Sequence, residues 1–263
     1  MIPRVIHYCW FGDGELSEMA IRCINSWKEK CPDYTIKKWT EKDFDMKQYP
    51  YMREAYEEKA WGFVPDIARL IIILNEGGVY FDTDVELLKP IDELLDNKAF
   101  FGFENITKVN LGQGFGAEPH NKVIYEMLNA YKDRHFRHAN GEIDKTPSPY
   151  IQTETLKKLG MKLNGGMQKV EGAMIYPSDF FCPLDFDTGE CVISSNTVSI
   201  HHFDGSWLDD YQRTMIELKR QTLIANRGIK GKLVWQYIRI KERVKKDGLI
   251  GSLRLLLRKI KYE

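Results

Sequence analysis

Several features that mark other classes of protein are missing from this sequence of 263 residues. Its five cysteines form no Cys-x-x-Cys pair and no metal-ligand spacing, and an odd number in a chain of this length is not a disulfide framework. No apolar run approaches the roughly 20 residues of a transmembrane helix, and the first residues lack the basic and apolar regions of a signal peptide. These absences argue against secreted, disulfide-rich and membrane-spanning proteins, so we expect a cytoplasmic location.

The chain also has no net charge, but only because two parts of opposite charge cancel. Lys and Arg number 38, and so do Asp and Glu. Residues 213–263 hold 15 basic and 4 acidic residues, a net of +11, so residues 1–212 carry −11. Apolar residues make up 43% of the chain, enough for one substantial core. We therefore predict a globular domain at 1–212 and a basic helical tail at 213–263, whose charge indicates an anionic partner.

Strand and helix patterns alternate along the predicted globular domain. Short apolar or alternating runs predict strands, and apolar residues at intervals of three and four predict helices. The predicted strands are 5–10, 34–39, 79–81, 100–104 and 192–202; the predicted helices are 15–30, 49–60, 66–76 and 122–135; the predicted loops are 110–119 and 141–149. This order predicts an α/β fold with a Rossmann-like sheet, in which ligands bind beyond the carboxyl ends of the strands.

Four charged residues surround the third predicted strand. Asp82 and Asp84 follow it directly, and two carboxylates so placed can converge on one Mg²⁺ or Mn²⁺ ion. Asp66 and Arg69 share one face of the preceding helix. A D-x-D tripeptide alone usually marks a solvated turn, and an i,i+3 ion pair alone is worth little. Packed together, however, the four would form a charge-dense pocket, which is costly unless it serves a ligand.

The segment that carries these residues resembles a known family. The run FVPDIARLIIILNEGGVYFDTDVELLKPID at 63–92 resembles the sugar-binding DxD region of glycosyltransferase family 32, which includes capsular-polysaccharide transferases and yeast-type mannosyltransferases. The spacing is also similar to that of the large clostridial glucosylating toxins. IPRVIHYCWFG at 2–12 resembles the family's opening strand, IYPSDFFCPLDF at 175–186 a later segment, and HHFDGSW at 201–207 its closing motif.

The resemblance implies a GT-A fold and a retaining transferase that needs Mn²⁺ or Mg²⁺ on the diphosphate of its donor. It implies that Asp84 coordinates the metal, while Asp82 reaches the metal, ribose or donor sugar. Asp66 and Arg69 would hold the sugar hydroxyls and the phosphate. On this basis Asp66, Arg69 and Asp82 are the predicted catalytic residues.

The resemblance also implies further contacts to the donor. Trp10 would stack on the nucleotide base, although a tryptophan at this strand end can equally belong to the core. Ser206 and Trp207 of the closing motif would cover the diphosphate. Gln113, with Asn110, lies in a glycine-rich loop that could line the sugar site. This loop is not a G-x-G-x-x-G element, so it does not support a dinucleotide site.

One of two adjacent histidines is predicted to complete the metal site. Neighbouring residues of a strand point to opposite faces, so only one of His201 and His202 can face the aspartates. Val198 and Ile200 indicate the apolar face, which His202 would continue. We therefore favour His201 over His202 as a metal or phosphate ligand, a role that the resemblance to the family's closing motif implies.

The basic tail has an amphipathic pattern. Apolar residues recur at intervals of three and four in two stretches separated by Gly248, and cationic residues lie opposite the second stretch. The apolar residues are Leu233, Tyr237, Ile240, Val244, Leu249, Leu253, Leu256 and Ile260, and the cations are Arg254, Arg258 and Lys261. Residues 230–261 could dock on the acidic domain or lie on an anionic membrane, and we favour the membrane. Sparse aromatic residues argue against nucleic acid as the partner.

These observations together predict a metal-dependent, retaining hexosyltransferase. It would move a sugar from a nucleotide-sugar, with a UDP-sugar favoured, to a glycan or lipid-linked acceptor in the synthesis of a surface polysaccharide such as a capsule. It would sit in the cytoplasm, peripherally associated with the inner face of the membrane. Two alternatives stay open: a nucleotidyl- or phosphotransferase with the same metal site, and a non-catalytic membrane-associated adaptor.

Overall fold

The computed structural model describes residues 1–205, 208, 210–226 and 228–260. The chain forms two compact units, of which the first consists of Met1–Leu184 and Cys191–Trp207 and the second of Asp185–Glu190 and Leu208–Glu263. The domain boundary that we placed after residue 212 stays a prediction. Among the helices within the described ranges, none is both long and apolar enough to cross a membrane.

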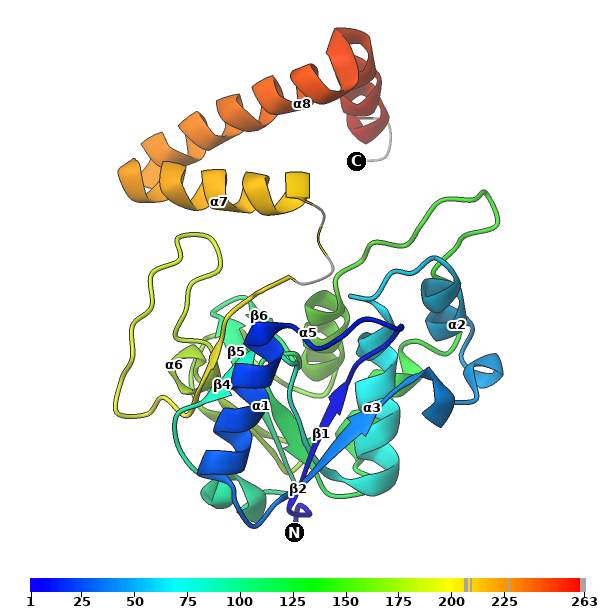
Figure 1. Cartoon of the computed structure of the whole chain (residues 1–263), viewed down its shortest axis with the longest axis vertical. Coiled ribbons are helices and arrows are strands. Elements are labelled where there is room, and N and C mark those ends of the chain that lie inside the picture. The colour runs from blue at the N-terminus through cyan, green and yellow to red at the C-terminus, as the bar shows by residue number, and fades with distance from the viewer. Residues whose placement is uncertain (206–207, 209, 227, 261–263) are drawn as a thin grey trace. The chain divides into compact units, whose positions relative to one another are not determined.

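A mixed sheet forms the centre of the first unit (Figure 1). Its strands lie in the order β2-β1-β3-β7-β5-β9-β8, and β6 pairs with β5. Their bounds are β1 Val5–Cys9, β2 Thr35–Trp39, β3 Gly78–Tyr80, β5 Ala99–Asn105, β6 Lys108–Val109, β7 Phe115–Ala117, β8 Gln168–Val170 and β9 Ala173–Tyr176. β1 runs parallel to β2 and β3, whereas β7 runs antiparallel between β3 and β5. The predicted α/β architecture with a mixed sheet is therefore confirmed.

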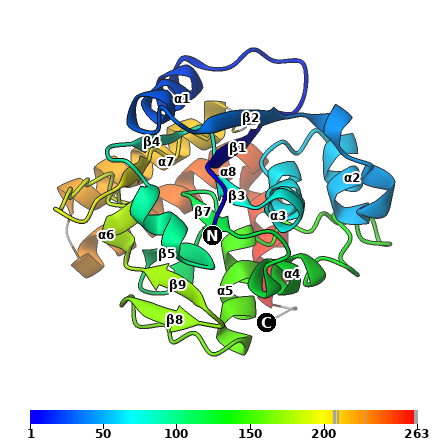
Figure 2. The ribbon, with the colours of Figure 1, turned by 90° about the horizontal axis from the view of Figure 1, so that it is seen from below.

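Helices cover both faces of this sheet, as Figure 2 shows. One face carries α2 Pro50–Glu57, α3 Val64–Glu76, α4 Lys122–Asn129 and α5 Ser148–Lys158, and the other carries α1 Glu18–Lys30 and α6 Ser178–Phe181. Short 3-10 helices span Glu41–Asp43, Met46–Gln48 and Asp92–Asp96. Each face has its own apolar cluster, with Met52 and Ile67 in one and Cys23 and Trp27 in the other. The sheet is thus the middle of three layers, as in other α/β folds.

The segment from α3 to β3 follows directly from its sequence. Pro65 lies in the first turn of α3, where its missing N–H costs nothing. Gly77 ends the helix with φ of 68° and donates its N–H to Ile73 O. Gly78 then enters β3 with φ of 96°, where an added Cβ would lie 2.7 Å from Val5 O. Glycine is therefore required where this strand lies against β1.

Some predicted boundaries are wrong. The predicted loop 110–119 contains β7, whose Gly116 lies so close to β5 that a Cβ would meet the Phe100 ring at 2.5 Å. A glycine that permits close strand packing has the same sequence signal as a loop glycine. The predicted strand 192–202 is a strand only at β10, Ser199–His201, because Val192 and Ile193 are exposed. β10 pairs with β4 Val85–Leu87 in a separate two-stranded sheet.

Two helices make up most of the second unit: α7 Asp210–Ala225 and α8 Gly228–Ile260, which pack against each other. α8 continues through Gly248, where the sequence pattern restarts. The segment Asp185–Glu190 joins this unit through an ion pair between Asp187 and Lys219. The structure does not describe the side chains of residues 246–260, so the predicted stripe at Leu249, Leu253, Leu256 and Ile260, with Arg254 and Arg258, is not tested. Lys261 lies outside the described residues.

Candidate functional site

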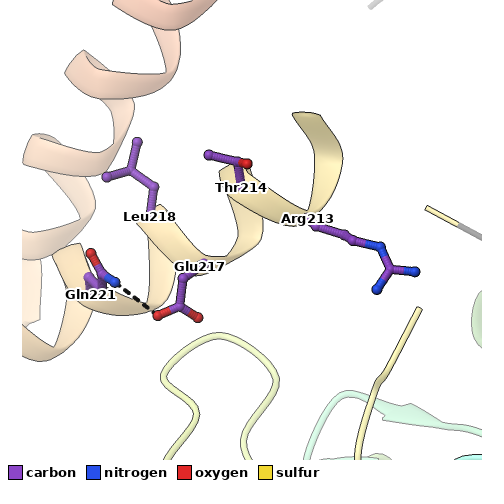
Figure 3. Close-up of a pocket in the computed structure, with 5 residues that line it drawn as sticks. All are labelled: Arg213, Thr214, Glu217, Leu218 and Gln221. Carbon is purple, nitrogen blue, oxygen red and sulfur yellow. Dashed lines mark hydrogen bonds between the residues drawn. The ribbon is translucent and has the colours of Figure 1, made fainter. Parts of the chain in front are cut away.

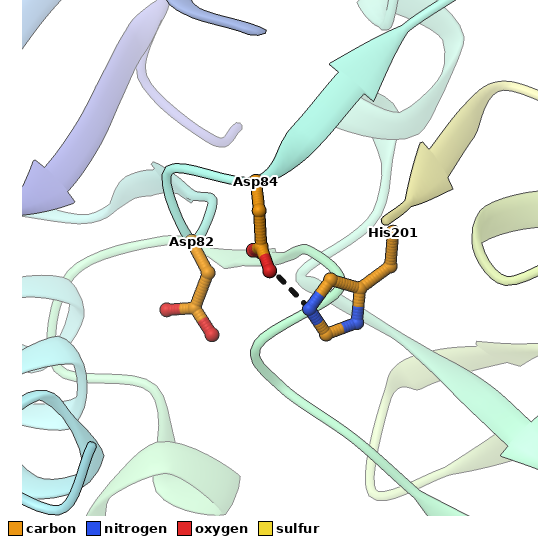
Figure 4. A group of neighbouring side chains, drawn as sticks. All are labelled: Asp82, Asp84 and His201. Carbon is orange, nitrogen blue, oxygen red and sulfur yellow. Dashed lines mark ion pairs between the residues drawn. The ribbon is translucent and has the colours of Figure 1, made fainter. Parts of the chain in front are cut away.

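Two strands that are far apart in the sequence bring Asp82, Asp84 and His201 together (Figure 4). Asp82 and Asp84 lie in the connection between β3 and β4, and His201 ends β10. The antiparallel pairing of β10 with β4 places His201 opposite Val85. One ligand atom from each of the three side chains lies within 4.8 Å of the others.

Asp84 and His201 form a buried pair within this group. His201 Nε2 lies 3.3 Å from Asp84 Oδ1, and their side chains are 8% and 18% exposed. Burial raises the pKa of Asp84, but the His201 imidazole and the backbone N–H of Asp204 outweigh burial and hold this pKa below its usual range. Burial lowers the pKa of His201, but Asp84 outweighs it, so the net shift of this pKa is upward. The pair therefore favours a charged imidazole when no cation is bound.

His202 faces a different environment from His201. Its Nε2 lies 2.8 Å from Glu86 Oε2 and 3.2 Å from Arg22 Nη2. Its backbone N–H donates to Asp84 O at 3.0 Å. The structure thus places His201, rather than His202, beside the two aspartates, which agrees with the strand-alternation argument.

The α3 pair lies beside the same aspartates. Arg69 Nη2 is 2.8 Å from Asp66 Oδ1, and its Nη1 is 3.4 Å from Asp82 Oδ2. Arg69 Nε also donates to Pro65 O. The side chains of Arg69 and Asp66 are only 4% and 6% exposed, whereas that of Asp82 is 28% exposed. The sequence prediction that these residues form one constellation is therefore matched by their geometry.

Burial and charge act in opposite directions on these groups. Burial raises the pKa of Asp66 to about 6, although Arg69 favours the charged form. Burial likewise raises the pKa of Asp82 against the influence of Arg69. Burial works against the charge of Arg69, but Asp82 and Asp66 outweigh it and raise the pKa of the guanidinium. Arg69 therefore stays a cation, and strongly perturbed carboxyls around one cation are typical of a functional site.

Several neighbours of Asp82 escaped the sequence prediction. Tyr80 Oη donates to Asp82 Oδ1 at 3.1 Å, and the Arg69 guanidinium lies 5.2 Å from the Tyr80 ring. The signal was present, because Tyr80 is two residues from Asp82 and so points to the same face of an extended chain. The carbonyl oxygen of Gly112 accepts a hydrogen bond from the backbone N–H of Asp82. An added Cβ at Gly112 would lie 2.3 Å from Asp82 Oδ2.

A short hydrogen-bond chain fixes the loop that carries Gly112. Asn110 Oδ1 accepts from the Gly112 N–H at 2.8 Å, and Asn110 Nδ2 donates to Glu104 Oε2 at 3.0 Å. Asn110, predicted as a sugar contact, therefore holds the loop that braces Asp82. Glu104 was not predicted, since nothing in the sequence joins the end of β5 to this loop.

The remaining predicted donor contacts differ in their surroundings. Trp10 is partly buried against the α1-side cluster, and its Nε1–H donates to Gly14 O at 2.6 Å. Gln113 is 0% exposed and donates from Nε2 to Phe103 O, so its side chain lies within the core. Ser206 and Trp207 lie outside the described residues. Contacts of these four residues with a donor stay predictions.

The donor atoms present fit a divalent cation. Two carboxylates and one imidazole converge, and the ring nitrogen next to Asp84 is His201 Nε2, 3.3 Å from Asp84 Oδ1. Carboxylate oxygens suit Mg²⁺ and Mn²⁺, and an added imidazole nitrogen suits metals of the first transition row. Three carboxylates, including Asp66, face one guanidinium and one imidazole, so a cation would also balance the local charge.

A separate hollow lies on α7 in the second unit (Figure 3). Its lining residues are Arg213, Thr214, Glu217, Leu218 and Gln221. Gln221 Nε2 donates to Glu217 Oε1 at 2.9 Å. All five residues come from one helix, and they form no group comparable with the Asp82, Asp84 and His201 cluster.

Comparisons with known proteins find similarity to glycosyltransferases. Residues 17–101 match the family described as glycosyltransferase sugar-binding region containing DXD motif. The chain is 31% identical over 154 residues to inositol phosphoceramide mannosyltransferase 1 of Schizosaccharomyces pombe, covering 51% of this chain and 45% of that protein. It is 31% identical over 127 residues to the initiation-specific alpha-1,6-mannosyltransferase of Candida albicans, covering 44% and 33%.

A similar solved structure is the PaToxG glycosyltransferase, with a TM-score of 0.48 and 20% identity over 60% of this chain and 68% of that chain. The chain spans less than half the length of each of these two yeast relatives. The sequence similarities support a glycosyltransferase. The segment that matches the family, residues 17–101, includes Asp66, Arg69, Asp82 and Asp84.

Proposed function

We propose that this chain is a metal-dependent, retaining glycosyltransferase that moves a hexose from a nucleotide-sugar to a glycan or lipid-linked acceptor. The juxtaposition of the Asp82, Asp84 and His201 cluster with the buried Arg69–Asp66 pair carries the proposal. Neither feature alone is specific for this function. Together they place a site for a metal cation beside the fixed positive charge of the Arg69 guanidinium. A diphosphate linked to a sugar needs both kinds of contact.

Each residue has a distinct part in this proposal. Asp82, Asp84 and His201 would hold Mn²⁺ or Mg²⁺, which would supply positive charge at the diphosphate of the donor. Arg69 would donate to a phosphate oxygen through its planar guanidinium and stabilise the charge that develops on the leaving nucleoside diphosphate. Asp66, held by Arg69, would accept a hydrogen bond from a sugar hydroxyl.

The names of the relatives support one class of acceptor and one alternative donor. The S. pombe relative is named for transfer of mannose to inositol phosphoceramide, a lipid. A lipid-linked acceptor is therefore consistent with our proposal for this chain. We favour a UDP-sugar as donor, and a GDP-linked mannose is the first alternative because both yeast relatives are mannosyltransferases.

A panel of UDP- and GDP-sugars, each with and without Mn²⁺, tests this function. We expect one donor to raise the melting temperature only with metal present, and to be hydrolysed slowly to free sugar and nucleoside diphosphate. Asp84→Asn should lower the rate at least about 100-fold, because it removes a ligand charge. Asp133→Asn is the matched control: the same change at an exposed carboxylate, expected to leave the rate unaltered.

The products separate this function from its alternatives. Release of a sugar phosphate together with a nucleoside monophosphate, from cleavage within the diphosphate, would indicate the nucleotidyl- or phosphotransferase. Failure of every donor to bind would support the adaptor and contradict our proposal. Retention predicts that the glycosidic product keeps the anomeric configuration of the donor, which proton NMR of the product measures directly.

A further inference from the structure

The outward face of α8 carries a stripe of exposed apolar side chains. Ile229, Leu233, Tyr237 and Ile240 are 79%, 65%, 67% and 51% exposed. They recur at intervals of four, four and three, so they lie on one side of the helix, and the half-buried Val244 continues the same spacing. Aligned apolar side chains of this size on one helix face are a binding surface more often than an accident of composition.

The opposite side of α8 is already occupied. Gly231 is buried, and a Cβ there would lie 3.4 Å from Leu223 of α7. Val234, Trp235 and Ile238 share the face of Gly231 and are half-buried. α8 therefore has two apolar faces, and only one of them is needed to pack the helix. The exposed stripe is additional to the packing of the unit.

Cationic side chains border the exposed stripe on both of its sides. Positions along the helix place Lys232, Arg239 and Arg243 on one flank and Lys230, Lys241 and Lys245 on the other, and all six are exposed. Glu242 is the single acidic residue between 228 and 245. Long cationic side chains beside an apolar stripe can extend to lipid phosphates while the stripe enters the acyl boundary.

We propose that this face of α8, residues 229–245, binds the surface of an anionic membrane. Charge complementarity selects that occupant: Lys245 pairs with Glu242, but an uncharged partner would leave the other five cations around the stripe without an anionic partner. The proposal is independent of the proposed function, since it uses no residue of the candidate active site. If both hold, the membrane surface would be where the chain meets a lipid-linked acceptor.

Co-sedimentation of the full chain with vesicles tests the proposal. Phosphatidylcholine vesicles are compared with phosphatidylcholine mixed with phosphatidylglycerol, and we expect binding to the mixed vesicles that weakens with salt. The variant L233E/Y237E/I240E should partition at least about tenfold more weakly. I106E/Y125E/Y150E is the matched control, because it replaces three other exposed apolar side chains and makes the same charge change away from α8.

A second variant separates the contribution of the cations to membrane binding from that of the apolar stripe. K230Q/K232Q/R239Q/K241Q keeps the stripe and should lose about fivefold in affinity for anionic vesicles per cation removed. Circular dichroism checks that every variant keeps its helical content.

Three results would overturn the proposal. One is equal binding to neutral and anionic vesicles, or none to either. Another is amide protection of 229–240 without vesicles that is lost in L233E/Y237E/I240E while helical content is kept, which would show that the stripe already packs against another part of the chain. The third is a dimer that L233E/Y237E/I240E dissociates, which would assign the stripe to a second copy of the chain. Donor binding should persist in the stripe variant, so failure here is distinguishable from failure of the proposed function.

Discussion

At the scale of single residues, His7 shows how a buried polar side chain can be fully satisfied. It is 0% exposed in β1, with Nε2 3.0 Å from Gly77 O and Nδ1 accepting from Trp39 Nε1 at 3.0 Å. These partners require the neutral ring with its proton on Nε2. A proton added to Nδ1 would remove the acceptor that Trp39 uses. Burial accordingly lowers the pKa of His7 to about 4.

This pKa predicts how stability depends on pH. Between about 4 and 6.5 the unfolded chain binds a proton at His7 that the folded chain does not, so this contribution is complete above about 6.5 and is lost as the pH falls toward 4. The loss amounts to about 3 kcal/mol. Urea unfolding at several pH values measures it. His7→Asn, which keeps an acceptor near Trp39, should be less stable at pH 7 and show a flatter pH dependence over that range. An equal slope in both proteins would contradict the assignment.

A second prediction at this scale concerns a substitution at Gly112. A Cβ at this position would lie 2.3 Å from Asp82 Oδ2 and 3.1 Å from Arg69 Nη1, so Gly112→Ala must displace the carboxylate. We expect at least about tenfold weaker Mn²⁺ binding and a similar loss of transfer, because ligand geometry is disturbed while the charge is kept. Isothermal titration with Mn²⁺ measures the first effect. Gly166→Ala, where the nearest atom is 3.5 Å away, is the control and should bind Mn²⁺ normally.

At the scale of elements, the pairing of β10 with β4 assembles the predicted cation site. The backbone N–H of His202 donates to Asp84 O, which ties the end of β10 to the second aspartate. His202→Pro removes both the imidazole and this N–H, whereas His202→Ala removes the imidazole alone. We expect Mn²⁺ binding to fall about tenfold or more in the proline variant only. Equal losses in both variants would show that the ring, and not the strand pairing, is what matters.

The elements also show how far the sequence could predict the fold and the site. Regular periodicity located α3 and β3 to within two residues, and proline and glycine fixed the ends of that segment. The neighbourhood of Asp66, Arg69 and Asp82 followed from their spacing, since helix and strand are joined by a tight turn. The pairing of β10 with β4 and the brace from Glu104 could not be predicted, because they join residues that are distant in the chain and depend on packing alone.

At the scale of the whole molecule, the division into two units predicts that metal and donor protect the first unit and leave the second unchanged. The predicted metal and donor residues within the described ranges all lie in the first unit, and the exposed stripe lies in the second. Mn²⁺ with UDP should therefore slow amide hydrogen exchange around β3, β4 and β10 while leaving α7 and α8 unchanged. Exchange followed by mass spectrometry measures this pattern. Equal protection of α8 would show that donor binding is coupled to the second unit.

The thiols give the chain a practical property. Cys9, Cys23, Cys31 and Cys182 are buried, and burial raises the pKa of Cys9, Cys23 and Cys31 to between about 11 and 12. Cys191 is exposed, directly after the segment Asp185–Glu190. A maleimide dye should therefore attach at Cys191 without mutagenesis. With a second cysteine introduced by Gln236→Cys on α8, a donor and an acceptor dye can be attached at positions 191 and 236. Energy transfer between the two dyes then reports any change in the distance between Cys191 and α8 as vesicles are added.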